Sequence, residues 1–125
     1  MEEGYFIENR TSEIKEIMNA FYNSWSLESS SKWSDDNPAA GQCSVTALVV
    51  HDLLGGEIKK TQLSGGWHFY NVLNGTRYDF TESQFTEKVE YMDQSSNREE
   101  AFNDTNERQY TYLKRHVFQH LERKF

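Results

Sequence analysis

The chain has 125 residues and a mass of 14.7 kDa, which suits a single domain, because two cores would leave each half too little apolar surface to bury. Thirteen lysines and arginines against 20 aspartates and glutamates give a net charge of −7, which disfavours nucleic-acid binding. No apolar run is long enough to span a membrane, and the acidic amino terminus is unlike a secretory signal. We therefore expect one cytoplasmic domain over residues 1–125 that binds neither nucleic acid nor membranes.

Two helices are predicted ahead of any strand. Residues 10–25 carry apolar side chains at spacings of three and four, and Thr11 or Ser12 is placed to cap the first turn. A polar loop over 26–37 follows. Residues 42–54 are apolar on most faces and end at a glycine pair, which indicates a central, largely buried helix.

Three short strands are predicted next, over 57–63, 67–73 and 76–80, and an Asn-Gly pair lies between the last two. Asn-Gly is the strongest short-range signal for a two-residue hairpin turn. Such a turn pairs Leu73 with Thr76, Val72 with Arg77, Asn71 with Tyr78, Tyr70 with Asp79 and Phe69 with Phe80. Because side chains alternate along a strand, one face carries His68, Tyr70, Val72, Arg77 and Asp79. The other face, an aromatic core layer, carries Trp67, Phe69, Tyr78 and Phe80.

A short helix is predicted after the third strand. Thr81 and Gln84 have the spacing of a capping box, and the apolar residues Phe85, Val89 and Met92 follow them.

The remaining residues combine an acidic segment and a last helix. Residues 82–107 are acidic, and we interpret them as a solvated face or loop, with docking of a basic partner as an alternative. The last helix is predicted from about Thr105, with an apolar stripe of Tyr110, Leu113, Val117 and Leu121 and with Arg123 and Lys124 near its end. This order of elements predicts an α+β domain, in which the central helix packs on a small antiparallel sheet and terminal helices cover the aromatic face.

Three residues form a candidate catalytic site. His68 lies diagonal to Asp79 across the hairpin, roughly 7–8 Å between backbones, so their side chains can meet. Cys43 is the only cysteine and lies in the first turn of the buried helix, where free N–H groups and the helix dipole stabilise a thiolate. Asp79 would orient His68, and His68 would take the thiol proton or share it as an ion pair.

Four further residues are candidates for substrate binding. The side-chain amide of Gln42 or Asn37 could help to hold a developing oxyanion, and Trp67 and Tyr70 could line a substrate cleft. Structural alternatives stay open: Cys43 as a small buried side chain, His68 as a satisfied strand histidine, Asp79 as a cap for the following helix, and both aromatic residues as core.

No metal or cofactor is expected. His116 and His120 are four residues apart on the last helix, but the glutamate of the zinc metalloprotease motif is missing between them. A single cysteine excludes both an intramolecular disulfide and a cysteine cage. The glycine pairs lack the spacing of a phosphate-binding loop.

Residues 37–58, 65–71 and 74–85 resemble the small bacterial YunG-like family. The order of a cysteine at a helix start, a histidine on a strand and an aspartate on the next strand is also similar to the minimal core of papain-like and transglutaminase-like enzymes. These resemblances imply such a fold, with Cys43 as nucleophile, His68 as base and Asp79 as orienting acid.

The expected function is therefore thiol-dependent acyl chemistry, hydrolysis or transfer at an amide, isopeptide or thioester bond. Its substrate would be a peptide, a protein or a small acyl compound. The alternative is a non-catalytic module, an inactive relative of such enzymes that binds a peptide or protein. The oligomeric state stays open.

Overall fold

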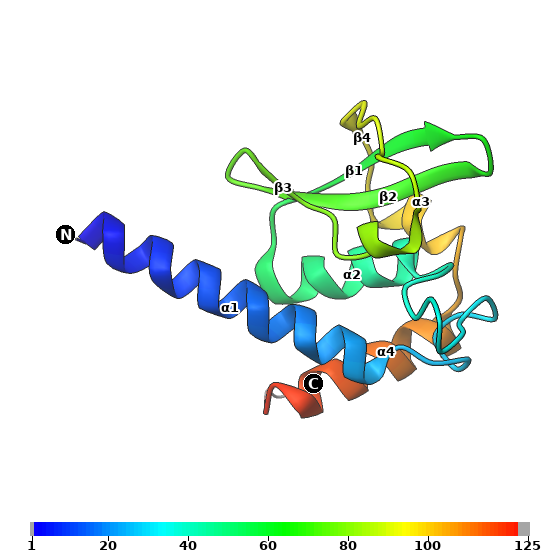
Figure 1. The fold of residues 1–125 in the computed structure, drawn as a ribbon, viewed down its shortest axis with the longest axis horizontal. Coiled ribbons are helices and arrows are strands. Elements are labelled where there is room, and N and C mark those ends of the chain that lie inside the picture. The colour runs from blue at the N-terminus through cyan, green and yellow to red at the C-terminus, as the bar shows by residue number, and fades with distance from the viewer. Residues whose placement is uncertain (1, 123–125) are drawn as a thin grey trace.

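The computed structural model describes residues 2–122, with side chains from residue 11 onward. The described residues form four α-helices, one short 3-10 turn, and a four-stranded antiparallel sheet (Figure 1). The helices are α1 (Glu2–Ser24), α2 (Cys43–Leu54), α3 (Arg98–Phe102) and α4 (Glu107–His120), and the 3-10 turn is η1 (Glu82–Gln84). The strands, in spatial order, are β3 (Thr76–Tyr78), β2 (Gly66–Leu73), β1 (Glu57–Leu63) and β4 (Gln94–Ser95). The predicted α+β class is confirmed.

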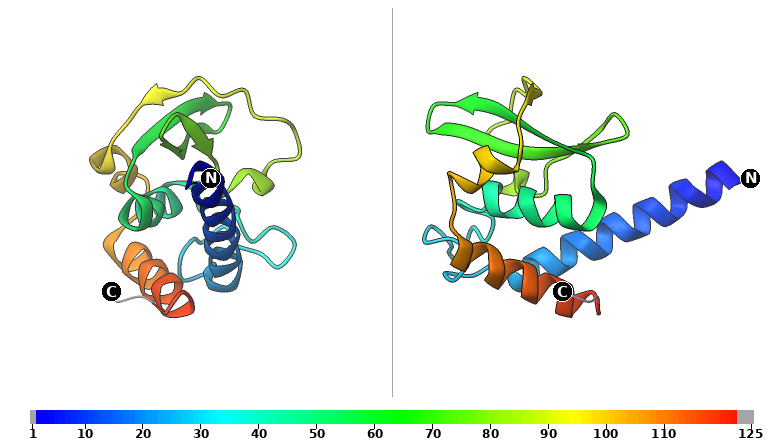
Figure 2. Two further views of the ribbon diagram at one scale, coloured as in Figure 1. Left: turned by 90° about the vertical axis from the view of Figure 1, so that its left-hand side faces the viewer. Right: turned by 180° about the vertical axis from the view of Figure 1, so that it is seen from behind.

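Helix α2 is the middle one of three layers, between the sheet and the pair α1 and α4 (Figure 2). The sheet covers one face of α2 and the helices α1 and α4 cover the other, so both faces of this helix need apolar side chains. On the sheet side, Ala47 and Leu48 pack with Phe69. On the other side, α2 joins a larger cluster whose buried members include Ile17, Ala20, Phe21, Trp25, Val45, Val49, Val50, Phe80, Leu113 and Val117.

The prediction that terminal helices cover the aromatic face of the sheet is only partly right. Phe80 meets Phe21 of α1, with ring centroids 5.6 Å apart, but Phe69 faces α2 instead. Trp67 is 39% exposed and contributes no core layer. The central helix α2 therefore covers most of the sheet face that was expected to pack against the terminal helices.

The hairpin register is confirmed, with Leu73 opposite Thr76, Val72 opposite Arg77 and Asn71 opposite Tyr78. Asn74 and Gly75 have φ values of 52° and 80°, and two positive values in succession are the requirement of a type I′ turn. Strand β3 ends at Tyr78, two residues earlier than predicted.

The helix predicted after Thr81 is wrong, since only the turn η1 forms there. Its two capping residues have other partners. The Thr81 hydroxyl donates to Oδ1 of Asp79, and the side-chain oxygen of Gln84 accepts from the backbone N–H of Gly41, 3.3 Å away. Long-range contacts thus occupy the groups that a capping box needs, and the chain continues without a helix to β4, which pairs with β1.

The other helix ends also differ from expectation. Helix α1 begins at Glu2, so Thr11 and Ser12 lie inside it rather than at its start. The acidic segment 82–107 is mostly loop, as interpreted, but contains β4 and α3. Helix α4 is capped by Asn106, whose side chain accepts from the N–H of Gln109. The basic residues Arg123 and Lys124 lie outside the described residues.

Substituting Gly56 with alanine should destabilise the protein by about 2 kcal/mol or more. Gly56 links α2 to β1 with φ +77°, and a Cβ there would lie 2.7 Å from the carbonyl oxygen of Val72. Urea unfolding measures the change. Gly65→Ala is the matched control, because no heavy atom lies within 4 Å of the added carbon. Equal stability of both variants would contradict the expected clash.

Candidate functional site

The structure brings His68 and Asp79 together in a buried pair. Nε2 of His68 donates to Oδ2 of Asp79 at 2.6 Å, and their side chains are only 2% and 4% exposed. The other carboxylate oxygen, Oδ1, accepts from the backbone N–H of Thr81 at 3.2 Å. The Phe85 ring lies perpendicular to the imidazole, with centroids 4.8 Å apart. Asp79 therefore binds both the imidazole and the backbone N–H of Thr81, although the helix that it was expected to cap does not form.

Cys43 is the first residue of α2, and its thiol lies beside the same imidazole. Residue Gln42 precedes the helix and makes no side-chain capping bond. The N–H groups of a first helical turn have no partner within the helix, so the positive end of α2 lies at the sulfur. Nδ1 of His68 is buried and has no aligned hydrogen-bond partner among the described side chains. The Cys43 thiol acts on the ring electrostatically without forming a well-aligned bond to this nitrogen.

The pKa of His68 is raised from 6.5 to about 9. Burial by itself lowers the pKa, because it penalises the charged ring, but the hydrogen bond and charge of Asp79, and then the neighbouring Cys43 side chain, outweigh it. The imidazole therefore carries its proton at neutral pH. The carboxylate on one side of the ring and the cysteine on the other both favour the protonated imidazole.

The raised pKa predicts how stability depends on pH. The folded protein holds the His68 proton more tightly than the unfolded chain, so this contribution is fully present below about pH 6.5 and is lost as pH rises through about 9. The loss is on the order of 3 kcal/mol. Urea unfolding at pH 6 and at pH 9.5 measures it in the parent protein and in His68→Gln. An equal change in both proteins would show that His68 is not its source.

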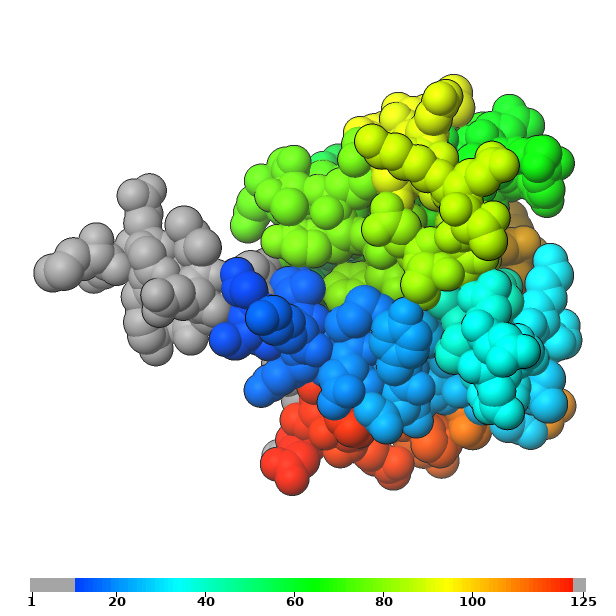
Figure 3. All heavy atoms as spheres, in the orientation of Figure 1, coloured from blue at the N-terminus to red at the C-terminus, as the bar shows by residue number. Residues whose placement is uncertain are grey.

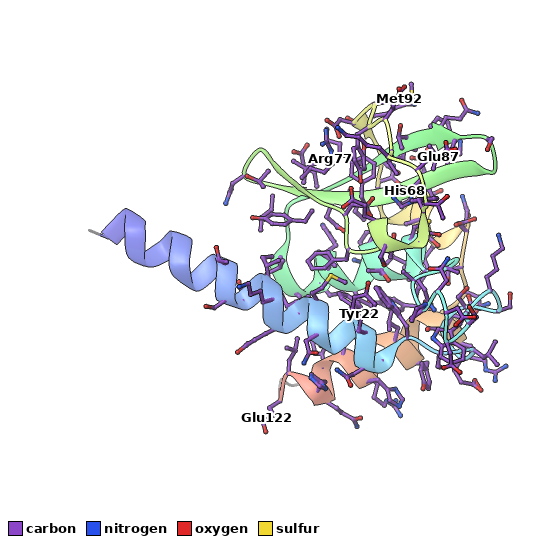
Figure 4. All side chains as sticks on the ribbon, in the orientation of Figure 1. Tyr22, His68, Arg77, Glu87, Met92 and Glu122 are labelled. Atoms are coloured by element: carbon purple, nitrogen blue, oxygen red, sulfur yellow. The ribbon has the colours of Figure 1, made fainter. Side chains whose placement is uncertain are left out.

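Cys43 and His68 lie on the wall of one open cavity of about 810 Å³. Its walls come from the loop before α2, the β1–β2 hairpin, the segment after η1 and the start of the α4 region. The loop before α2 and the segment after η1 border each other on the face in Figure 3 (cyan and yellow-green). Polar and charged residues dominate the lining, including Lys32, Glu87, Lys88 and Asp104. Figure 4 labels His68 and Glu87, on β2 and on the segment after η1. The cavity has the size of a small-molecule or side-chain site.

The four predicted substrate-binding residues have different places. Trp67 and Asn37 line the cavity, although the Asn37 amide donates to the carbonyl oxygen of Gln84. The side chain of Gln42 is fully buried, is not on the cavity wall and leaves both its polar atoms without a partner. Tyr70 is buried away from the cavity, where its hydroxyl donates to Asp93.

Two residues that the sequence analysis assigned to a helix belong to the site. Gln84 joins the loop before α2 to η1, and its buried Nε2 on the cavity wall has no partner. Phe85 packs on the imidazole. A third residue of the site is Tyr91, whose hydroxyl donates to Asp79 at 2.8 Å. No spacing in the sequence predicts the contact between Tyr91 and Asp79. The contact forms only because the chain after Phe85 is not helical and returns to the sheet.

Other features of the described part of the chain do not extend this site. His116 donates to the carbonyl oxygen of Tyr112, while His120 contacts Asn19, and the described residues contain no group of three or more potential metal ligands. A second cavity, of about 300 Å³, is lined by His51 and Arg98, which are hydrogen-bonded to each other. No helix among the described residues is long and apolar enough to cross a membrane.

Comparisons with known proteins agree on one family. The family model described as "YunG protein" matches residues 13–122. A protein of Bacillus subtilis (strain 168), with the name "Uncharacterized protein YunG", is 53% identical over 98 residues, which cover 78% of this chain and 85% of that protein. No solved structure matches the chain.

Proposed function

The chain belongs to the YunG family, and we propose that it is a thiol-dependent acyl hydrolase or transferase that uses Cys43, His68 and Asp79. One observation carries the proposal: the buried His68 imidazole lies between the Asp79 carboxylate and the Cys43 thiol, and Cys43 begins a helix at an open cavity. Burying a charged ring is costly, and here its two neighbours offset that cost.

In the first step the Cys43 thiolate attacks the carbonyl carbon of an amide, isopeptide or thioester. The carbonyl π electrons move to oxygen, and first-turn N–H groups of α2 stabilise the resulting oxyanion. When this intermediate collapses, the bond to the leaving group breaks, and the leaving group takes the proton of His68. The products are an acyl-Cys43 thioester and a neutral imidazole held by Asp79.

In the second step water or an amine attacks the thioester, and His68 accepts the proton of the attacking group. The carbon–sulfur bond then breaks, and the thiolate and imidazolium are restored. Asp79 keeps its negative charge throughout and stabilises the imidazolium. Hydrolysis and transfer differ only in the acceptor.

The same arrangement supports a papain-like or transglutaminase-like core, because the cysteine, histidine and aspartate follow one another in that order on α2, on β2 and directly after β3. The cavity lining combines both charge signs with the exposed Trp67, which suits a peptide, a protein side chain or a small polar acyl compound. A reactive thiol is best preserved where cellular reductants keep it free, which favours the cytoplasm.

Alkylation and acylation test the proposal. Because the chain has one cysteine, labelling by iodoacetamide reports Cys43 alone. At pH 6.5 the parent protein should react at least about tenfold faster than His68→Ala, since an ordinary thiol is mostly protonated there. p-Nitrophenyl acetate should form acetyl-Cys43, detected by mass spectrometry. His120→Ala, at an exposed histidine of α4, is the matched control and should behave as the parent does.

Two results would overturn the proposal: equal alkylation rates in the parent and in His68→Ala, or no acetyl-Cys43 at any pH from 6 to 9. Either outcome would favour the alternative of a binding module without catalysis.

A further inference from the structure

Oδ2 of Asp79 has a second hydrogen-bond donor besides His68. The Tyr91 hydroxyl lies 2.8 Å from Oδ2, the same carboxylate oxygen that accepts from Nε2 of His68 at 2.6 Å. We infer that Tyr91 is a positioning residue, whose hydroxyl holds Asp79 and sets how strongly the carboxylate supports the His68 imidazolium. The meaning of this contact for catalysis rests on the proposed function, whereas its effect on His68 does not.

The ring of Tyr91 is held in place from several sides. It packs edge-on against Tyr70, with centroids 4.9 Å apart, and the guanidinium of Arg77 lies 4.2 Å from the ring centroid. Arg77, labelled in Figure 4, is itself held by two bonds of 3.0 and 2.6 Å to the carboxylate of Asp93. The Tyr70 hydroxyl donates to the same carboxylate. A ring fixed in this way presents its hydroxyl to Asp79 at little further cost in entropy.

Two carboxylates face the Tyr91 hydroxyl, Asp79 at 2.8 Å and Glu82 at 3.2 Å. The hydroxyl has one hydrogen, so the shorter contact to Asp79 is the stronger bond. Burial, and then these two carboxylates, raise the pKa of Tyr91 far above its usual value. The hydroxyl therefore stays protonated and remains a donor throughout the pH range in which His68 titrates.

A donor on Oδ2 withdraws negative charge from the oxygen that serves His68. Removing the donor in Tyr91→Phe should therefore raise the pKa of His68, by on the order of half a unit. Replacing Tyr91 with 3-fluorotyrosine, which has a more acidic hydroxyl and is a stronger donor, should shift the pKa of His68 the other way. Opposite shifts from two nearly isosteric changes are not expected of a purely structural residue.

The experiment is an NMR titration of the His68 ring in the full chain labelled with 13C-histidine. Tyr22→Phe is the matched control, because the Tyr22 hydroxyl donates to Ser83 of η1 at 2.7 Å, close in the chain to Glu82, without touching Asp79. We expect an upward shift in Tyr91→Phe, a downward shift with 3-fluorotyrosine and none in Tyr22→Phe. No shift in the two Tyr91 variants, or shifts in the same direction, would overturn the inference.

Acetylation by p-nitrophenyl acetate separates this inference from the proposed function. If the His68 titration shifts as expected but Cys43 is never acetylated, the contact stands and the proposed function fails. If the parent is acetylated and the pH profile of that reaction is identical in Tyr91→Phe, the function stands and Tyr91 is not a positioning residue.

Discussion

Asparagine in place of Asp79 should lower the pKa of His68 from about 9 to near or below 6.5. The carboxylate is the main group that raises this pKa, and without it the opposing effect of burial prevails. At pH 7.5 the imidazole is then neutral and lacks the positive charge that the proposed mechanism places beside the sulfur, so acetylation of Cys43 should slow by about a hundredfold or more. NMR titration of His68 and the rate of acetyl-Cys43 formation measure the two effects.

Asp52→Asn is the control for this substitution. Asp52, on α2, is also a hydrogen-bonded carboxylate, but its partners are Arg98, Tyr110 and Lys114, which lie outside the candidate site. Its replacement should leave the acetylation rate within a few fold of the parent. An unchanged His68 titration in Asp79→Asn would contradict the proposed site, whatever the acetylation rate.

Phe21→Ala should cost about 3–5 kcal/mol of unfolding free energy, the largest loss of stability that we expect from a single core substitution here. Phe21 of α1 is fully buried in the hydrophobic cluster that α1 forms with α2 and α4. Its ring lies 5.7 Å from that of Trp25 and 5.6 Å from that of Phe80. A small side chain there leaves a cavity that several rigid rings cannot fill. Urea unfolding at pH 7 gives the difference.

The matched control is Leu27→Ala, since Leu27 is 62% exposed and should change stability by less than about 0.5 kcal/mol. Phe80 follows Asp79 in the chain, so loss of its packing partner should also loosen the carboxylate and broaden the His68 signal. A loss below about 1 kcal/mol in Phe21→Ala would mean that the cluster closes around the gap.

The part of the site that lies on the hairpin was predictable from local signals. Asn74-Gly75 sets the turn, the turn sets the register, and the register brings His68 within reach of Asp79. Cys43 was placed correctly at a helix start because an apolar run and a closing glycine define that helix. These elements form through interactions between residues only two to four positions apart in the chain, and tertiary packing does not change them.

The segment after Asp79 was not predictable in the same way. Thr81 and Gln84 have capping-box spacing, but Asp79 and the loop before α2 bind their polar groups first. The short helix α3 had an unused signal, since Asn97 stands three residues before Glu100 and accepts a bond from its N–H. Strand β4 had no signal, because a two-residue strand exists only through its pairing with β1.

Local sequence thus determined the helix start that bears the cysteine and the hairpin that pairs histidine with aspartate. Hydrophobic periodicity and turn-forming residues act between neighbours in the chain, so this helix and this hairpin form from local interactions whatever surrounds them. The tertiary structure alone decided that the thiol reaches the imidazole, that Gln84 and Phe85 close the site, and that Tyr91 shares the carboxylate. Those contacts join residues far apart in sequence, and they form only because long-range hydrogen bonds and ring packing outweigh the weak helical preference of the connecting segment.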